Sequence, residues 1–246
     1  MAHNVLTRAG RSLQDFDATW LPRLIDSAEA VASVPGCSTD VPSLLEEGGV
    51  DIPSAHVRVG SVMAEATAKD LAFLWSRHFT GSGCDEKVIL EVIETTWAAA
   101  SNATKSVVPL GPDVYRTLAR HRDLGISLGL VTNDTEATGR EMLSKLGVLH
   151  MFDAVVGYDS GWGAKPQPGG VLSALRQLGV NPCKAVMVGD SPADIQAGCA
   201  AGCMARVAIS QHSVGELPAS FDGTTHAMHD IRGLLELIPE DGGSVL

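Results

Sequence analysis

The sequence contains no long apolar run. Among its 246 residues, no stretch of uncharged apolar residues reaches the roughly 18 that a membrane-spanning helix needs. The opening residues, MAHNVLTRAGRS, hold no apolar segment of signal-peptide length. The sequence therefore predicts neither a membrane-spanning helix nor a secretory signal. We expect a cytoplasmic protein without a membrane partner.

Basic clusters and the usual metal-binding spacings are missing as well. The formal net charge is -11 and there is no run of Lys or Arg, so the chain repels polyanions and a nucleic-acid partner is not expected. Its five cysteines form no C-x-x-C pair, and its eight histidines form no H-x-x-x-H pair. Neither a disulfide framework nor a zinc site built from Cys and His is therefore predicted.

What the chain does contain is enough apolar sequence for one sizeable core, at 45% hydrophobic residues. From about residue 107, short apolar runs alternate with helical patterns, which is typical of βαβ units and predicts a doubly wound parallel sheet of the α/β class. The predicted strands are 127–132, 154–157, 185–189 and 204–208, and the predicted helices are 113–122, 136–146, 169–178 and 192–201.

An earlier part of the chain has a different pattern. Segments 24–34, 62–79 and 86–100 show apolar spacing near 3.6 residues and few β-branched clusters. We interpret residues 18–105 as an inserted helical domain. Residues 1–17 and 106–246 then form the α/β core domain.

Chemistry-bearing side chains follow two of the predicted core strands. Thr132 and Asn133 leave one strand with a hydroxyl, an amide and backbone N–H groups that suit phosphate oxygens. Asp190 and Asp194 follow another strand and together form a potential site for Mg²⁺, which prefers carboxylates, water and phosphate oxygens. The alternative is helix capping, because Thr, Asn, Ser and Asp are all favoured at helix N-termini.

A lysine stands in a stiffened loop between these segments. Lys165 is followed by two prolines in Lys165-Pro-Gln-Pro168, just before a predicted helix. A fixed ammonium beside a bound phosphate would offset the charge of a transferring phosphoryl group. An ordinary solvated lysine is the alternative.

Taken together, Val131-Thr-Asn133, Gly163-Ala-Lys-Pro-Gln-Pro168 and Val188-Gly-Asp-Ser-Pro-Ala-Asp-Ile195 resemble the haloacid dehalogenase superfamily of Mg²⁺-dependent phosphatases. The resemblance covers roughly residues 107–210 and is closest to the phosphoglycolate-phosphatase-like members. It implies that the inserted helical domain, 18–105, is a cap, and that the substrate is a small phosphorylated metabolite.

The resemblance also implies a mechanism. An aspartate at the end of the first strand attacks phosphorus, a second aspartate two residues later protonates the leaving group, and Mg²⁺ bridges nucleophile and phosphate. Thr132 would hold a phosphate oxygen with Asn133 beside it, and Lys165 would neutralise charge. Asp190 and Asp194 would hold the metal.

The first motif of this family, Asp-x-Asp-Gly-Thr-Leu, has two possible registers here. In one, Asp15-Phe-Asp-Ala-Thr19 is the motif, so that Asp15 is the nucleophile and Asp17 the acid/base, but the residues leading into it are polar and include two arginines. In the other, which we favour, Asn4–Thr7 is the strand and Arg8 and Gly10 occupy the two catalytic positions.

The second register has a chemical consequence. A guanidinium is no nucleophile and stays protonated, and glycine has no proton to donate. Phosphate could still bind near Thr132, Lys165 and Arg8, and Arg8 could occupy the place of the metal. The alternative function is then a catalytically silent phosphate- or partner-binding protein on the same scaffold; a carbon–halide dehalogenase is a weaker third hypothesis, because it needs no metal.

Overall fold

The computed structural model describes residues 4–7, 13, 15–79, 86–102, 112–209 and 221–237. The chain divides into two compact units. The first, called the core unit below, comprises Met1–Asp15 and Pro109–Leu246, and the second, called the helical unit, comprises Phe16–Val108. Each unit is described by itself.

The core unit is built on a six-stranded sheet in the order β5-β4-β1-β6-β7-β8, and every neighbouring pair is parallel. Every residue of β4 and β6 is buried, as expected for strands covered on both faces. The predicted doubly wound α/β fold is therefore confirmed. The strands are β1 (Asn4–Thr7), β4 (Leu128–Val131), β5 (Ala154–Val156), β6 (Ala185–Gly189), β7 (Ala205–Ile209) and β8 (His226–Met228).

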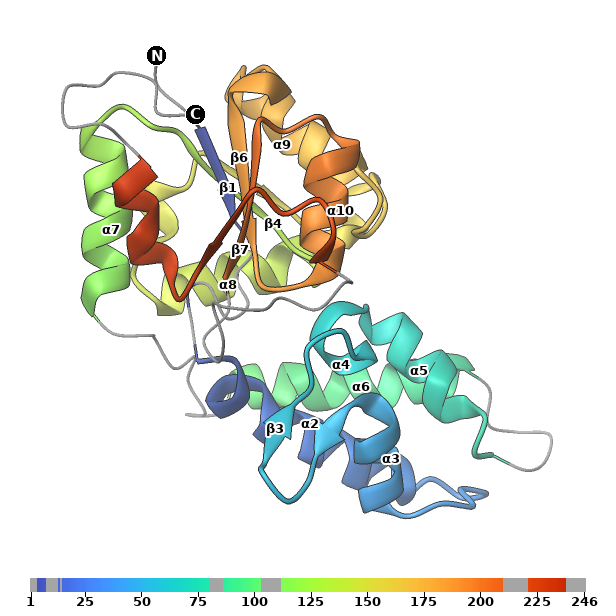
Figure 1. Ribbon diagram of the computed structural model, residues 1–246. Coiled ribbons are helices and arrows are strands. Elements are labelled where there is room, and N and C mark those ends of the chain that lie inside the picture. Colours follow the sequence, from blue (N-terminus) through green and yellow to red (C-terminus); the bar gives the residue numbers. More distant parts are fainter. Residues whose placement is uncertain are drawn as a thin grey trace. The chain divides into compact units, whose positions relative to one another are not determined.

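Helices cover both faces of this sheet. Successive strand residues point to opposite sides, so buried strands need a helix layer on each face. The glycines show how closely they pack: a Cβ at Gly139 of α8 would meet Leu130 and Val155, whereas one at Gly170 of α9 would meet Val131. Figure 1 shows α9 and α10 on the face opposite α7. The helices are α7 (Pro112–Asp123), α8 (Glu136–Lys145), α9 (Gly169–Leu178) and α10 (Pro192–Ala200), with short 3-10 helices at Leu149–Met151, Tyr158–Ser160, Pro182–Lys184 and Ile231–Leu237.

Strand β1 lies in the middle of the sheet, between β4 and β6. Its last residue, Thr7, is fully buried and is level with Leu130 of β4 and Val188 of β6. The first strand is thus Asn4–Thr7, the strand of the second register. Residues 8–12 and 14, which include Arg8 and Gly10, lie outside the described residues.

The helical unit has its own core of buried apolar side chains from α2, α3, α5 and α6. Trp75 is fully buried and donates its indole N–H to the carbonyl of Leu44 at 3.0 Å, and Trp20 packs edge-on against Trp97 with ring centroids 5.3 Å apart. Its elements are α2 (Phe16–Ala32), α3 (Val41–Gly48), β2 (Val50–Asp51), β3 (His56–Val57), α4 (Val62–Glu65), α5 (Ala68–Ser76) and α6 (Glu86–Asn102). Within the described part of the chain, no helix is both long and apolar enough to cross a membrane.

Two features of the helical unit differ from the expected pattern. The helix predicted over 62–79 is two helices, because Thr67 and Asp70 form a reciprocal capping box that starts a new helix at Ala68. The two-residue strands β2 and β3 form an antiparallel hairpin that was not predicted. Strands this short leave no alternating apolar pattern to detect.

The core unit contains a buried histidine. His121, in the last turn of α7, is 1% exposed, and its Nδ1 lies 2.7 Å from the carbonyl oxygen of Thr117. Burial lowers the pKa of His121 below its ordinary value of 6.5, although the contact with the Thr117 carbonyl partly opposes the shift. The neutral imidazole is therefore the form that suits the folded state.

We predict that acid destabilises the wild type more than a His121→Leu variant. Because the pKa of His121 is lower in the folded chain, the unfolded chain binds the proton first, and stability is lost as pH falls through about 6.5. Thermal unfolding midpoints at pH 7.5 and 5.5 measure the effect, with exposed His150→Gln as the matched control. Equal acid sensitivity in the wild type and His121→Leu would contradict this assignment.

Candidate functional site

Lys165 is the centre of the candidate site. Its Nζ donates to the carbonyl oxygen of Val131, the last residue of β4, at 2.7 Å. The same Nζ forms an ion pair with Oδ1 of Asp194 at 2.7 Å, and the two side chains are 2% and 0% exposed. The structure thus brings together two of the predicted site residues, from the β5–α9 loop and from α10, at the end of β4.

Asn133 holds the loop that carries Lys165. Its side-chain oxygen accepts from the backbone N–H of Lys165 at 2.8 Å, and its amide nitrogen donates to the carbonyl of Lys165 at 3.1 Å. Both ends of the Asn133 amide therefore bind the Lys165 backbone. The sequence predicted that Asn133 contacts phosphate. In the structure its amide instead positions the backbone of Lys165.

Asp194 is held from a second side by the start of its own helix. Its Oδ2 accepts from the backbone N–H of Ser191 at 3.1 Å and from the Ser191 hydroxyl at 2.8 Å, in a capping box. Gly189 permits this arrangement, since a Cβ there would lie 2.3 Å from the Cβ of Asp194. Both carboxylate oxygens of Asp194 are thus engaged. The sequence analysis treated Gly189 as part of a motif and Ser191 as a possible cap. It did not predict that either residue would make room for, or hold, the carboxylate of Asp194.

Thr132 and Asp190 follow the ends of β4 and β6, and both are buried, at 4% and 3% exposure. The Thr132 hydroxyl donates to Asp134 at 3.2 Å and accepts from the Asp134 backbone N–H at 3.1 Å. The N-cap of α8 is Thr135, three residues later, so capping of that helix does not account for Thr132. Thr132 and Asp190 remain the predicted phosphate-binding and metal-binding groups at the ends of these strands.

The side chains of Asp190 and Asp194 do not form the joint Mg²⁺ ligand set that the sequence predicts. Mg²⁺ takes oxygen ligands, usually a few carboxylates with water and phosphate. Asp190 is a suitable donor, but Oδ1 of Asp194 is occupied by an ammonium and its Oδ2 by Ser191. In the described ranges no group of three His, Cys, Asp or Glu side chains could hold a metal ion. The residues present therefore do not support Asp190 and Asp194 as a joint metal site.

The alternative catalytic acids, Asp15 and Asp17, lie at the start of α2. Asp15 is exposed. In the sequence it directly precedes α2, whereas β1 ends at Thr7. Asp17 accepts from the backbone N–H of Val57 at 3.0 Å and lies 2.6 Å from Nδ1 of His56. These contacts tie Asp17 to the hairpin of the helical unit. The first register, in which Asp17 serves as the acid/base, therefore has no support from this geometry.

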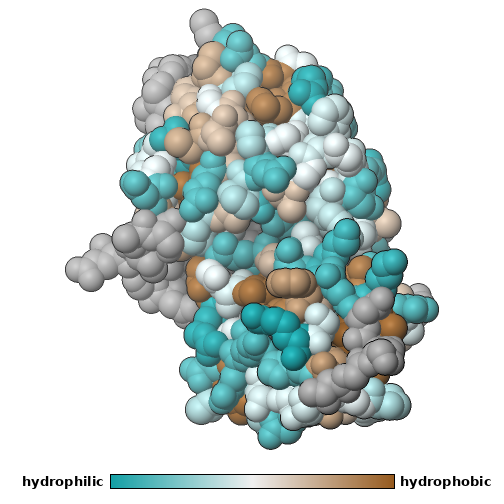
Figure 2. Space-filling view, turned by 90° about the vertical axis from the view of Figure 1, so that its right-hand side faces the viewer, coloured by the Kyte–Doolittle hydropathy of each residue, from teal (hydrophilic) through white to brown (hydrophobic). Residues whose placement is uncertain are grey.

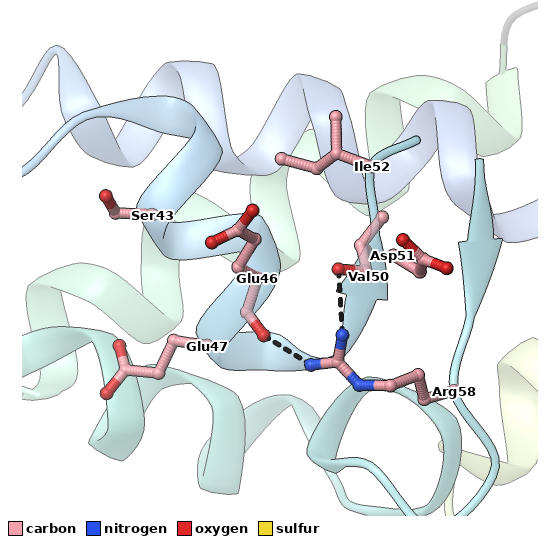
Figure 3. Close-up of a pocket in the computed structure, with 7 residues that line it drawn as sticks. All are labelled: Ser43, Glu46, Glu47, Val50, Asp51, Ile52 and Arg58. Carbon is pink, nitrogen blue, oxygen red and sulfur yellow. Dashed lines mark hydrogen bonds between the residues drawn. The ribbon is translucent and has the colours of Figure 1, made fainter. Parts of the chain in front are cut away.

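A pocket of about 490 Å³ lies within the helical unit, between α3 and the β2–β3 hairpin. Figure 3 shows the guanidinium of Arg58 donating to the carbonyls of Glu46 and Val50, at 2.7 and 3.2 Å. Two acids that line the pocket form contacts of their own: the Glu47 carboxylate pairs with Arg77 and His78, and the Asp51 carboxylate accepts from the Ser54 hydroxyl. The pocket contains none of the predicted site residues.

Exposed apolar side chains are scattered over the surface. On the face drawn in Figure 2, hydrophobic and hydrophilic residues are mixed, and the hydrophobic ones form small groups. Trp162, beside the Lys165 loop, is 47% exposed, and the guanidinium of Arg176 on α9 lies 4.5 Å from its ring. Trp162 thus packs against α9. Among the residues that the structure describes, the exposed large apolar ones are Ile52, Val59, Phe73, Val88, Tyr115 and Trp162.

Comparison with known proteins points to one family. The model of the haloacid dehalogenase-like hydrolase family matches residues 75–208, more than half of the chain. A phosphoglycolate phosphatase of Pseudomonas savastanoi is 27% identical over 221 residues, which cover 87% of this chain and 79% of that protein. One from Aquifex aeolicus is 38% identical over 98 residues, covering 40% of this chain and 46% of that protein.

Solved structures of similar fold agree. A predicted phosphoglycolate phosphatase from Haemophilus somnus superimposes with a TM-score of 0.70 at 19% identity, covering 96% of this chain and 97% of that one. CbbY from Rhodobacter sphaeroides, solved in complex with phosphate, gives 0.68 at 17% identity, covering 95% and 96%. At these identities the likeness concerns the fold.

We predict that Lys165→Met destabilises the protein by about 3 kcal/mol, because it leaves the charge of Asp194 buried without its ammonium. Adding Asp194→Asn should recover much of this loss, since asparagine keeps an oxygen for Ser191 and removes the charge. Urea unfolding of both variants measures the free energies.

The matched control is the exposed pair Arg140–Glu136 on α8, at 2.8 Å, where Arg140→Met should cost less than about 1 kcal/mol. A loss in Lys165→Met no larger than the loss in Arg140→Met would show that the buried pair does not stabilise the core unit.

Proposed function

Because the chain belongs to the haloacid dehalogenase-like hydrolase family, we propose that it recognises the phosphate group of a small phosphorylated metabolite at the ends of β4 and β6. The observation that carries this proposal is the buried ammonium of Lys165, held between Asp194 and the Val131 carbonyl. A lysine fixed and dehydrated in this way suits an anion-binding role better than that of a solvated surface residue.

Each side chain then has a definite task. The Thr132 hydroxyl would donate to a phosphate oxygen, and the Lys165 ammonium would offset the charge of the phosphoryl group. Asn133 and Asp194 would act as positioning residues, because Asn133 holds the backbone of Lys165 and Asp194 holds its ammonium. Asp190, which is buried directly after β6, would be a carboxylate ligand for a cation.

Hydrolysis of a phosphomonoester is the reaction that the relatives' names support. The phosphoglycolate phosphatases of Pseudomonas savastanoi and Aquifex aeolicus suggest a short phosphorylated carboxylate as substrate. In this form of the proposal the protein is a cytoplasmic phosphatase, and the helical unit is a cap that selects the substrate. A carboxylate must then act as the nucleophile that attacks phosphorus. Asp15 is the candidate nucleophile, since Asp17 is tied to His56 and Val57.

A second form, a catalytically silent phosphate-binding protein, is favoured by one specific observation. Strand β1 ends at Thr7, and the next residues in the sequence are Arg8, Ala9 and Gly10. The family's covalent step needs carboxylates at the first and third of these positions. Neither arginine nor glycine can supply one, so the wild-type chain would bind a phosphomonoester without hydrolysing it by that route.

We predict that restoring the two aspartates creates activity. With p-nitrophenyl phosphate and Mg²⁺, the hydrolysis rate of the wild type should lie near background. The rate of the double variant Arg8→Asp/Gly10→Asp should be roughly 100-fold higher, which is a modest share of the effect of a covalent nucleophile with its acid/base. Asp15→Asn should leave the wild-type rate unchanged. Clear wild-type hydrolysis that Asp15→Asn abolishes would instead establish the hydrolase form.

Recognition itself is tested by binding. Thr132→Val should weaken the binding of 2-phosphoglycolate roughly tenfold or more, as expected for the loss of a hydrogen bond to a charged group. Calorimetric titration measures this, and Thr95→Val, at an exposed position of α6, is the matched control. Equal affinity in the wild type and Thr132→Val would remove Thr132 from the site.

A further inference from the structure

We infer that Asp134 competes with phosphate for the hydroxyl proton of Thr132, and that its carboxylate thereby lowers the affinity of the site for anions. The inference rests on the proposed function, since it concerns the same hydroxyl. Three observations support it, concerning the single proton of this hydroxyl, the length of its contact with Asp134, and the charge of the carboxylate.

The Thr132 hydroxyl is already engaged as donor and as acceptor. It donates to Oδ2 of Asp134 at 3.2 Å and accepts from the Asp134 backbone N–H at 3.1 Å. A threonine hydroxyl has a single proton to donate, and the oxygens of a phosphate dianion only accept. Thr132 can therefore hold a phosphate oxygen only after its proton has turned away from Asp134.

The contact with the carboxylate is long enough to be exchanged. A hydroxyl that donates to a carboxylate usually lies about 2.5–2.7 Å from the accepting oxygen. At 3.2 Å the contact between Thr132 and Asp134 is longer, so this hydrogen bond is weak. A phosphate oxygen that approaches to the usual distance is then the better acceptor for the proton.

The turn around the hydroxyl is fixed by contacts that do not involve the Asp134 carboxylate. The backbone N–H of Thr132 donates to the carbonyl of Val156 at 2.9 Å, and its methyl group faces Gly139 of α8, where a Cβ would lie 3.3 Å away. The carbonyl of Asp134 accepts from the backbone N–H of Tyr158 at 3.1 Å. With both backbones held, the half-buried side chain of Asp134 is the part that can rotate.

The carboxylate also opposes an anion by its charge. A phosphate oxygen that accepts from the Thr132 hydroxyl at about 2.7 Å would lie within roughly 6 Å of Oδ2 of Asp134 in its present place. This separation is shorter than the Debye length of about 8–10 Å, so salt screens the repulsion only in part. Asp134 thus disfavours a bound dianion in two ways, by holding the proton and by its negative charge.

Calorimetric titration of the full chain with inorganic phosphate tests the inference. Asp134→Asn keeps an oxygen for the hydroxyl and removes the charge, so it should bind phosphate roughly tenfold more tightly than the wild type. The ratio of the two dissociation constants should shrink at about 1 M salt, where the Debye length is about 3 Å. A merely structural role of Asp134 would give a ratio that does not respond to salt.

Asp123→Asn is the matched control for the change of charge. Asp123 is exposed at the end of α7, before β4, whereas Thr132 follows that strand. The four residues of β4 span roughly 13 Å, which exceeds the Debye length at physiological salt. Asp123→Asn should therefore bind phosphate as the wild type does.

A double variant tests whether Asp134 acts through the hydroxyl. In a Thr132→Val background, Asp134→Asn should give a smaller gain in affinity, since no hydroxyl proton is left to release. An equal gain in both backgrounds would overturn the competition for the proton. Wild-type affinity of Asp134→Asn, together with weakened binding by Thr132→Val, overturns the inference and leaves the proposed function intact. No phosphate binding by the wild type or by Asp134→Asn overturns both.

Discussion

The candidate site depends on a single buried ion pair. Lys165 and Asp194 come from different connections of the sheet, and their contact at 2.7 Å fixes the β5–α9 loop against the start of α10. An isolated ammonium or carboxylate at such burial would be costly, so each requires the other. Asn133, Ser191 and Gly189 all act around this pair, through the backbone of Lys165 or through the carboxylate of Asp194.

The same pair gives Lys165 and Asp194 a structural task in addition to any role in binding. Removal of either side chain would leave the other as an uncompensated buried charge. Strand β1 keeps its central place between β4 and β6, although the residues that follow it in the sequence include arginine and glycine.

Much of the core unit could be predicted because its strands are buried on both faces and read as apolar runs. Strand β6 matches its prediction in full, and β4 and β5 lie within theirs. Strand β8 was not predicted, since all of its three residues are half-buried and form no such run. Helix α2 starts at Phe16, well before the predicted residue 24, and contains Pro22, a residue that reads as a helix breaker.

The places of the candidate residues near strand ends could be predicted, but the contacts between their side chains could not. Spacing along the chain indicated that Thr132, Lys165, Asp190 and Asp194 follow strand ends or neighbouring loops of one sheet. It could not tell that Lys165 binds Asp194, because that choice depends on how Ser191 turns the carboxylate at the start of α10. Nor could it show that the Asn133 amide would be consumed by the backbone of Lys165.

The central place of β1 has a consequence for the order of folding during synthesis. Val5 pairs with Leu128 on one side and with Val186 on the other, so the sheet stays open at its middle until β6 has emerged from the ribosome. The helical unit, by contrast, is one continuous segment, Phe16–Val108, which emerges before β4. Because long loops must be closed before distant strands can join, we expect the sheet of the core unit to form later. The helical unit can then fold while the amino-terminal strand still lacks its partner strands.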